Sequence, residues 1–112
     1  MRPTRFYSSK QEKAVATAVG GRQVVNSGAT AFSKGDVQTD DFLIECKTSC
    51  SEKQAFSVKR EWLDKNDEER FAMGKSYSAL AFDFGTGKRY YIIDEKLFVK
   101  LTELLKKEEN GV

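Results

Sequence analysis

The feature that most constrains the fold is a pair of strand-like runs, residues 36–39 and 42–48, separated only by Asp40 and Asp41. Two such runs joined by so short a polar connection predict an antiparallel β-hairpin. With Asp40 and Asp41 as the two central turn residues, Asp36 lies directly opposite Glu45. A longer turn would slide Asp36 away from Glu45, because the register of a hairpin depends on its turn.

Side chains alternate between the two faces of a strand, so the hairpin has one polar and one apolar face. The polar face would carry Asp36, Gln38, Leu43, Glu45 and Lys47. The apolar face would carry Thr39, Phe42, Ile44 and Cys46. We therefore expect the second face to meet the core.

The rest of the chain alternates between helical and strand patterns. Helices are expected from the capping pattern Ser9–Glu12 to Gly20-Gly21, over residues 56–73 with a break near Asn66-Asp67, and around apolar positions 97, 98, 101, 104 and 105. Further strands are expected over residues 22–26, 77–84 and 89–93. The order predicts one α/β domain over residues 1–112, with a central mixed sheet flanked by helices, a flexible basic arm at 1–8 and a frayed tail at 106–112.

Composition narrows the possible chemistry. The chain has no histidine, which excludes histidine-based triads and histidine-ligated zinc. Its two cysteines, Cys46 and Cys50, make neither a disulfide framework nor a zinc quartet, and we expect free thiols. No apolar run is long enough for a membrane span and the first residues lack a signal core, so a cytoplasmic protein is expected.

Charge is unevenly distributed along the chain. Residues 1–35 hold six Lys or Arg and one acid, whereas the remainder has a net negative charge. This asymmetry is compatible with an anionic partner for the N-terminal part and equally with a solvated basic face. Two near matches to a phosphate-binding loop, at Gly74-Lys75-Ser76 and Gly87-Lys88, lack the first glycine of that motif, so no nucleotide cofactor is expected.

The polar face of the hairpin carries the strongest chemical hypothesis. Two opposed carboxylates, Asp36 and Glu45, repel each other unless a positive charge lies between them. Hard oxygen ligands suit Mg²⁺, with Mn²⁺ as a substitute. Lys47 adds an amine on the same face, where it can position a water or stabilise charge on a phosphate. The competing interpretation is a hairpin whose polar face simply meets water.

These residues resemble a known signature. Gly35-Asp36 followed by Leu43-Ile44-Glu45-Cys46-Lys47-Thr48 is similar to the D-(x)n-E-x-K pattern of the PD-(D/E)XK nuclease superfamily, with Gly35 where the family has proline. Within it, the chain looks most like the small Holliday-junction resolvases of phages and archaea, over roughly residues 5–95. Those proteins also have a glutamate on the first helix and a Ser-Gly-rich loop before the aspartate, here Glu12 and Ser27–Thr30.

The resemblance implies a restriction-endonuclease-like αβββαβ core, a homodimer, and Mg²⁺-dependent cleavage of branched DNA, in the host cytoplasm if the chain is phage-encoded. Asp36, Glu45 and the backbone carbonyl of Cys46 would hold the metal, Lys47 would act on the water and the scissile phosphate, and Glu12 would be an accessory catalytic and metal-binding carboxylate. Glu12 has an alternative role, because in Ser9-x-x-Glu12 it can simply cap the helix.

Other residues are candidates for DNA contacts. The basic ones can contact phosphates or form a solvated surface, and Ser27 is a candidate phosphate contact by resemblance. The set is Arg2, Arg5, Lys10, Ser27, Lys34, Lys53, Lys59 and Arg60. We expect the aromatic residues Trp62, Phe71, Phe82 and Phe84 to pack in the core rather than stack on bases.

The sequence therefore predicts an Mg²⁺-dependent endodeoxyribonuclease that resolves four-way junctions by paired cuts. Two alternatives stay open: a nuclease of the same superfamily that cuts flaps, damaged DNA or linear duplex, and a catalytically silent DNA-binding module of the same fold.

Overall fold

The computed structural model of the protein describes residues 4–24, 36–49 and 51–111. Its elements, in chain order, are α1 (Thr4–Val19), β1 (Arg22–Gln23), β2 (Asp36–Gln38), β3 (Phe42–Lys47), α2 (Arg60–Ala72), β4 (Tyr77–Asp83), β5 (Arg89–Ile92) and α3 (Glu95–Glu109). Three predicted DNA contacts, Arg2, Ser27 and Lys34, lie outside the described residues.

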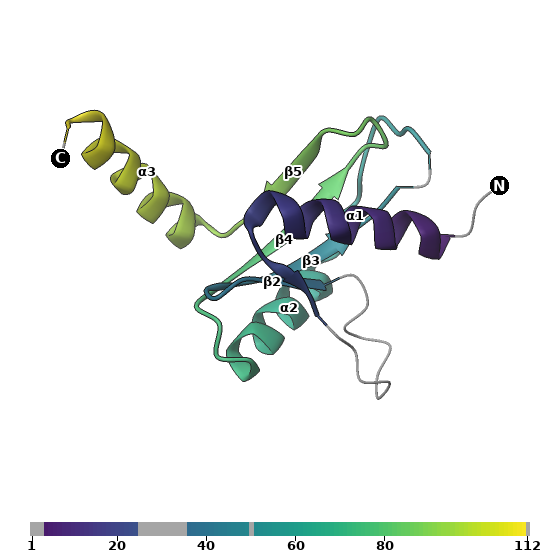
Figure 1. Ribbon diagram of the computed structural model, residues 1–112, viewed down its shortest axis with the longest axis horizontal. Helices are drawn as coiled ribbons and strands as arrows, with labels where there is room; N and C mark the ends of the chain where they lie inside the picture. Colours follow the sequence, from purple (N-terminus) through teal and green to yellow (C-terminus); the bar gives the residue numbers. More distant parts are fainter. Residues whose placement is uncertain (1–3, 25–35, 50, 112) are drawn as a thin grey trace.

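The strands form one five-stranded sheet in the order β1-β2-β3-β4-β5. β3 and β4 are parallel and the other neighbours are antiparallel, so the sheet is mixed and the α/β class is confirmed. A parallel pair needs a crossover connection, and α2 lies in that crossover. α1 and α2 cover opposite faces of the sheet (Figure 1).

The face under α1 is the apolar core. Its buried cluster comprises Val15, Val37, Ile44, Cys46, Ala79 and Ala81. Ile44 and Cys46 come from the hairpin face that the alternation predicted to be the core face, and Ile44 pairs with Ala79 of β4. Burial of this cluster is the main stabilising contribution of the α1 side.

The face under α2 is also covered, so the competing interpretation, in which the polar hairpin face simply meets water, is wrong. Leu43 and Leu80 are fully buried there. Asn66 of α2 is buried too, and its side-chain amide donates hydrogen bonds to the carbonyl oxygens of Leu43 at 3.3 Å and Ala79 at 3.1 Å. This amide bridges β3 and β4 and attaches α2 to the sheet. The predicted break near Asn66-Asp67 is wrong, because α2 is one continuous helix through both residues.

The helix ends differ from the predicted ones. α1 begins at Thr4, so residues 4–8 belong to a helix and not to a loose arm, and Ser9–Glu12 lie inside it instead of capping it. At the other end α3 runs to Glu109, so the predicted fraying from Lys106 is wrong. Lys106 and Lys107 stabilise its last turn, and Gly111 has a φ of 73° just beyond it.

Candidate functional site

The β2–β3 hairpin has the predicted register. Asp36 pairs with Glu45 and Gln38 pairs with Leu43. Thr39 closes the turn, because its hydroxyl oxygen accepts hydrogen bonds from the backbone N–H groups of Phe42 at 2.9 Å and Asp41 at 3.2 Å. This Thr side chain explains how an Asp-Asp pair, an uncommon two-residue turn, holds the register.

Asp36, Glu45 and Lys47 lie on the α2 face, as the alternation of side chains requires. Asp36 is 2% exposed and Glu45 is 8% exposed. Lys47 is at the end of β3, and its Nζ lies 3.4 Å from Glu45 Oε2 in an ion pair. The structure thus brings together the three residues at the centre of the predicted site.

Among the described residues, the positive charge of Lys47 offsets the burial of the Asp36 carboxylate only in part. The Asp36 Oδ1 atom is buried and accepts no hydrogen bond from this part of the chain. Burial, the largest cause, and the negative charges of Glu45, Glu69 and Glu12 together raise the pKa of Asp36 to about 8, against an opposite effect of Lys47. A buried oxygen without a donor costs free energy, so this position favours either a proton or a cation.

The effects of burial and of neighbouring charges on the pKa of Glu45 partly oppose each other. Burial raises its pKa, and the charge and hydrogen bonding of Lys47 oppose that shift. Two residues of α2 also act on it: Glu69 raises the pKa and Lys65 lowers it. Glu69 and Lys65 are parts of the site that the sequence analysis missed.

Periodicity could have identified the α2 contribution. Trp62, Asn66 and Glu69 recur at i, i+4 and i+7, which places them on one side of a helix. The sequence pattern did not reveal this side of the helix, because the buried side of an amphipathic helix is recognised by its apolar residues and the surrounding stretch is mostly polar. In the structure it is the side that meets the sheet.

Lys47 also contacts an aromatic ring. Its Nζ lies 4.2 Å from the centroid of the Trp62 ring, a cation–π distance. Trp62 lies beside Phe56, which in turn stacks on Phe82 with ring centroids 4.7 Å apart. Trp62 and Phe82 therefore pack with other aromatic residues, but both are only half-buried and lie outside the buried core. Trp62 in addition contacts the Lys47 amine. The expectation is wrong for Phe71, which is 77% exposed because α2 turns that side to solvent.

Glu12 lies in the middle of α1, so the capping alternative for it is wrong. Its Oε1 accepts a hydrogen bond from Gln23 Nε2 at 3.3 Å. Its charge raises the pKa of both Asp36 and Cys46. Glu12 therefore acts electrostatically on the hairpin from the α1 side.

Cys46 is the residue between Glu45 and Lys47, and its side chain is in the α1-side core. Burial raises the pKa of its thiol to about 12, with smaller contributions from Glu12 and Asp36. A protonated thiol on the opposite face is no metal ligand beside Asp36 and Glu45. The predicted role of the Cys46 backbone carbonyl as a metal ligand stays a prediction.

The donor set fits a small divalent cation with few protein ligands. Among the described residues, no group of three or more Asp, Glu or Cys side chains converges as a metal cluster. Asp36 and Glu45 face each other across the hairpin: Asp36 Oδ1 is buried and accepts no hydrogen bond from the described residues, and Glu45 Oε2 is buried beside Lys47 Nζ at 3.4 Å. Mg²⁺ is characteristically bound by one or two carboxylates, with water and substrate phosphate completing the shell.

The remaining predicted DNA contacts are spread over the surface. Lys10, Lys53, Lys59 and Arg60 are exposed, and Arg5 is in the first turns of α1. Lys59 directly precedes α2, with its Nζ 5.8 Å from the Trp62 ring centroid, so it lies near the site. Arg60 forms an exposed ion pair with Asp64 at 3.3 Å.

Comparisons with known proteins assign no family to this chain: no family model, no curated protein and no solved structure gives a significant match. In the part of the chain that the structure describes, no helix has the length and apolar character that crossing a bilayer requires. The functional interpretation therefore depends on the geometry of the hairpin site.

Proposed function

We propose that the protein is a metal-dependent endodeoxyribonuclease of the PD-(D/E)XK type, with four-way DNA junctions as its substrate. The observation that carries this proposal is the pairing of Asp36 with Glu45 on neighbouring strands, both buried on one face, with the Lys47 amine beside them. A stable core does not require two opposed buried acids, since such a pair costs folding free energy.

In this proposal Asp36 and Glu45 hold Mg²⁺, together with the backbone carbonyl of Cys46. When bound, the ion supplies a Lewis acid and a more acidic water. Lys47 donates from Nζ to an oxygen of the scissile phosphate as negative charge develops there. The ion pair with Glu45 and the ring of Trp62 keep that amine near the end of β3.

Glu12 and Glu69 add negative charge around the pair from α1 and α2. Both increase the attraction of the site for a cation, because the protein field there is negative before the ion binds. Glu12 is the accessory carboxylate of this proposal, and Glu69 adds a second.

The order of elements supports the proposed fold family. The run α1-β1-β2-β3-α2-β4 reads αβββαβ, as in a restriction-endonuclease-like core, with the acids on β2 and β3. Shape and backbone recognition suits the substrate, because the basic candidates are dispersed and exposed rather than arranged as a base-reading element. A homodimer would present two such sites to a four-way junction and make paired cuts.

The test is cleavage of a synthetic four-way junction with Mg²⁺, beside a flap and a linear duplex. We expect paired, symmetric cuts in the junction by the wild type, and junction binding without cutting by Asp36→Asn. Asp40→Asn, an exposed acid of the same hairpin, is the matched control and should cut normally. Preferred cutting of the flap or duplex would support the broader nuclease class instead. If none of the three substrates is cut in the presence of Mg²⁺, the proposal that the protein is an endodeoxyribonuclease is wrong.

A further inference from the structure

Aromatic side chains from four segments of the described chain form one layer beside the candidate site. They come from the segment before α2, the start of α2, the end of β4 and β5, and we call them the aromatic layer: Phe56, Trp62, Phe82, Phe84 and Tyr90. Ring centroids in contact lie between 4.7 Å and 6.3 Å apart. Tyr90 is 41% exposed and the other rings are half-buried, so the layer lies outside the buried core. An aromatic surface that stays open in the folded chain is typical of a binding site.

The register of the sheet lines this layer up with Lys47. Lys47 of β3 pairs with Phe82 of β4, and Phe82 pairs with Tyr90 of β5. Directly paired residues point to the same face, so the three side chains form a row across three strands on the α2 face. Strands about 4.8 Å apart put Tyr90 roughly 10 Å from Lys47. The aromatic layer therefore continues the surface that holds the proposed phosphate contact.

Tyr90 is the most exposed ring of the aromatic layer. Its ring stacks on Phe82, with centroids 5.9 Å apart and 29° between the ring planes. Phe84 meets it edge-on, with centroids 5.8 Å apart and 69° between the planes. Two phenylalanines thus fix the orientation of a ring that remains open to a ligand.

The segment before α2 supports the layer through backbone contacts. The backbone N–H of Lys53 donates to the carbonyl oxygen of Phe84 at 2.8 Å. Gly85 has a φ of 87°, and a Cβ atom there would come within 2.5 Å of the Ser51 carbonyl oxygen. Only glycine allows so close an approach of the two backbones. A surface fixed in this way loses little conformational entropy when a flat ligand stacks on it.

Amines lie at both ends of the aromatic layer. At one end, the Nζ atoms of Lys47 and Lys59 lie 4.2 Å and 5.8 Å from the centroid of the Trp62 ring. At the other end, Lys88 Nζ lies 5.4 Å from the centroid of the Tyr90 ring. Lys47 is also held by its ion pair in the candidate site, whereas Lys88 is exposed. A polyanionic backbone that runs along the layer would meet positive charge at each end.

Acidic residues also border the layer. Glu61 is in the first turn of α2, and Glu52 is exposed in the segment beside Gly85. The surface is therefore not uniformly basic, and phosphate contacts alone would hold a strand weakly. Stacking has to supply most of the affinity, so we expect a weaker salt dependence than for a strand held by its phosphates alone.

Flat aromatic faces beside amines suit an unpaired nucleic-acid strand, whose bases stack on rings while its phosphates contact lysines. Paired bases in a duplex have their faces covered by neighbouring bases and cannot reach Tyr90. We propose that the aromatic layer binds unpaired DNA nucleotides next to the scissile phosphate. One base stacks on Tyr90, and Lys88 moves from that ring to a phosphate oxygen. Stacking a base contributes more than the exposed cation–π contact that it replaces.

The distance along the row sets where the stacked base lies. Roughly 10 Å from Lys47 corresponds to about three stacked nucleotides at about 3.4 Å each. The proposal rests on the proposed function for the choice of DNA and places the unpaired nucleotides at the branch point of the substrate. Binding of a strand needs no cutting, so it is measured separately from the nuclease chemistry.

Fluorescence anisotropy of a labelled oligothymidylate of about ten nucleotides, in a chelator, tests the binding. We expect the wild type to bind this strand. An abasic strand of the same length keeps the phosphates without the bases, and we expect its dissociation constant to be at least about tenfold higher. Equal affinities for the two strands, or no binding of oligothymidylate, would overturn the proposal.

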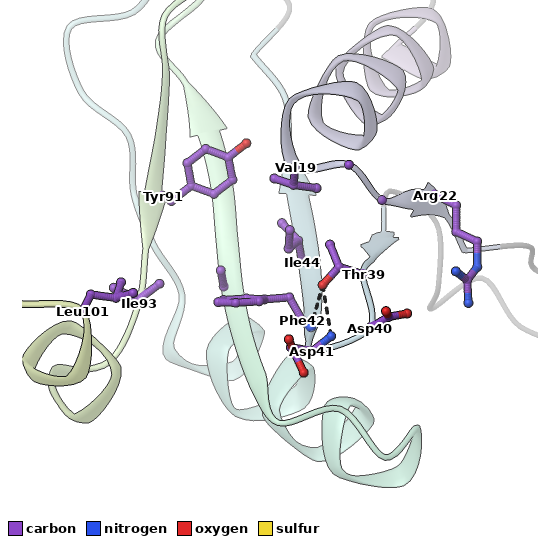
Figure 2. Close-up of a pocket in the computed structure, with 13 residues that line it drawn as sticks. Val19, Arg22, Thr39, Asp40, Asp41, Phe42, Ile44, Tyr91, Ile93 and Leu101 are labelled. Atoms are coloured by element: carbon purple, nitrogen blue, oxygen red, sulfur yellow. Dashed lines mark hydrogen bonds between the residues drawn. The ribbon is translucent and has the colours of Figure 1, made fainter. Parts of the chain in front are cut away.

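Variants of β5 test the ring itself. Tyr90→Leu should raise the dissociation constant about tenfold, whereas Tyr90→Phe keeps the ring and should stay within about twofold. Tyr91→Leu is the matched control, because Tyr91 is 40% exposed on the same strand but lines an apolar cavity on the α1 side with Val19 and Ile44 (Figure 2). It should also stay within about twofold, and thermal melting confirms that each variant is folded. Equal effects at the two tyrosines would overturn the role of Tyr90.

Two further ligands and the cleavage assay complete the test. Linear duplex bound as tightly as oligothymidylate would overturn the preference for unpaired bases, and oligouridylate bound more tightly would overturn the choice of DNA. A wild type that cuts the junction but does not bind the strand would overturn the role of the aromatic layer alone. Strand binding without any cutting would overturn the nuclease chemistry alone.

Discussion

The two faces of the sheet bury different kinds of side chain in this protein. Under α1, consecutive strands contribute aliphatic and small side chains that pack into a closed apolar cluster. Under α2, the same strands contribute two fully buried leucines, Leu43 and Leu80, and then two buried acids. Because both faces are covered by a helix, burial alone does not explain the difference. The α1 face stabilises the fold through apolar packing. The α2 face carries buried charged groups, which cost folding free energy.

Neighbouring residues of β3 show the contrast most directly. Ile44 faces α1 and is part of the core, whereas Glu45 faces α2 beside Asp36 and Lys47. Deletion of a core side chain removes packing and leaves a cavity. Neutralisation of a buried acid removes a desolvation cost instead. The comparison therefore predicts opposite signs for the stability effects of the two faces, and each prediction below tests one side of it.

The largest expected effect is on activity. Lys47→Met should reduce junction cleavage about 1000-fold, a size typical of removing one donor that stabilises transition-state charge. Junction binding and the folded state should be retained, because Lys47 is the last residue of β3 and its side chain is partly exposed. Single-turnover cleavage and an electrophoretic mobility shift measure the two quantities. Cleavage by the variant at the wild-type rate would contradict the proposed catalytic role of Lys47.

A stability loss of several kcal/mol is expected on the α1 face. Ile44→Ala should lower the free energy of unfolding by about 3 kcal/mol, through lost burial and a residual cavity. Urea denaturation monitored by circular dichroism gives the value. Val58→Ala, at a position that is 39% exposed, is the control and should change it by less than about 1 kcal/mol. A small effect at Ile44 would mean that this face is not the main core.

The α2 face should show the opposite sign, in a pH-dependent way. The folded state raises the pKa of Asp36 from 3.8 to about 8, so it binds this proton more tightly than the unfolded chain does. Stability from this group is full below about pH 4 and is lost as the pH rises toward about 8. At about pH 9 without divalent cations, Asp36→Asn should therefore be more stable than the wild type, by on the order of 2 kcal/mol.

Urea titrations at about pH 5 and pH 9 in a chelator measure this difference. Added Mg²⁺ should stabilise the wild type at the higher pH and leave Asp36→Asn unchanged, since a ligand that binds only the folded state adds stability. Asp40→Asn should follow the wild type at both pH values. A wild type whose stability is the same at both would contradict the raised pKa.

The smallest expected effect concerns Trp62. Trp62→Leu should lower the cleavage rate constant about fivefold with little change in substrate affinity, because a cation–π contact contributes about 1 kcal/mol. The ring should also shift the NMR signals of the Lys47 side chain upfield in the wild type, and Trp62→Leu should remove that shift. The NMR measurement does not depend on nuclease activity. Unshifted Lys47 signals in the wild type would show that the ring does not hold the amine in solution.

Much of the hairpin could be predicted from the sequence, and most of its surroundings could not. The pairing of Asp36 with Glu45 follows from a short turn and from alternation, which are local properties. The contact of Lys47 with Trp62 and the electrostatic effect of Glu69 on Asp36 join residues far apart in the chain. Such contacts depend on how α2 lies on the sheet. The start of α1 was misplaced because a capping pattern occurs inside helices as well as at their ends.

The sequence alone determined the hairpin, its register and the face that carries both acids, because these depend on residues that are close together in the chain. The tertiary structure decided that this face is buried and that Asn66, Glu69 and Trp62 meet it. The parallel pairing of β3 with β4 places α2 over the acids, and a mostly polar helix gives little local indication of which side it will bury.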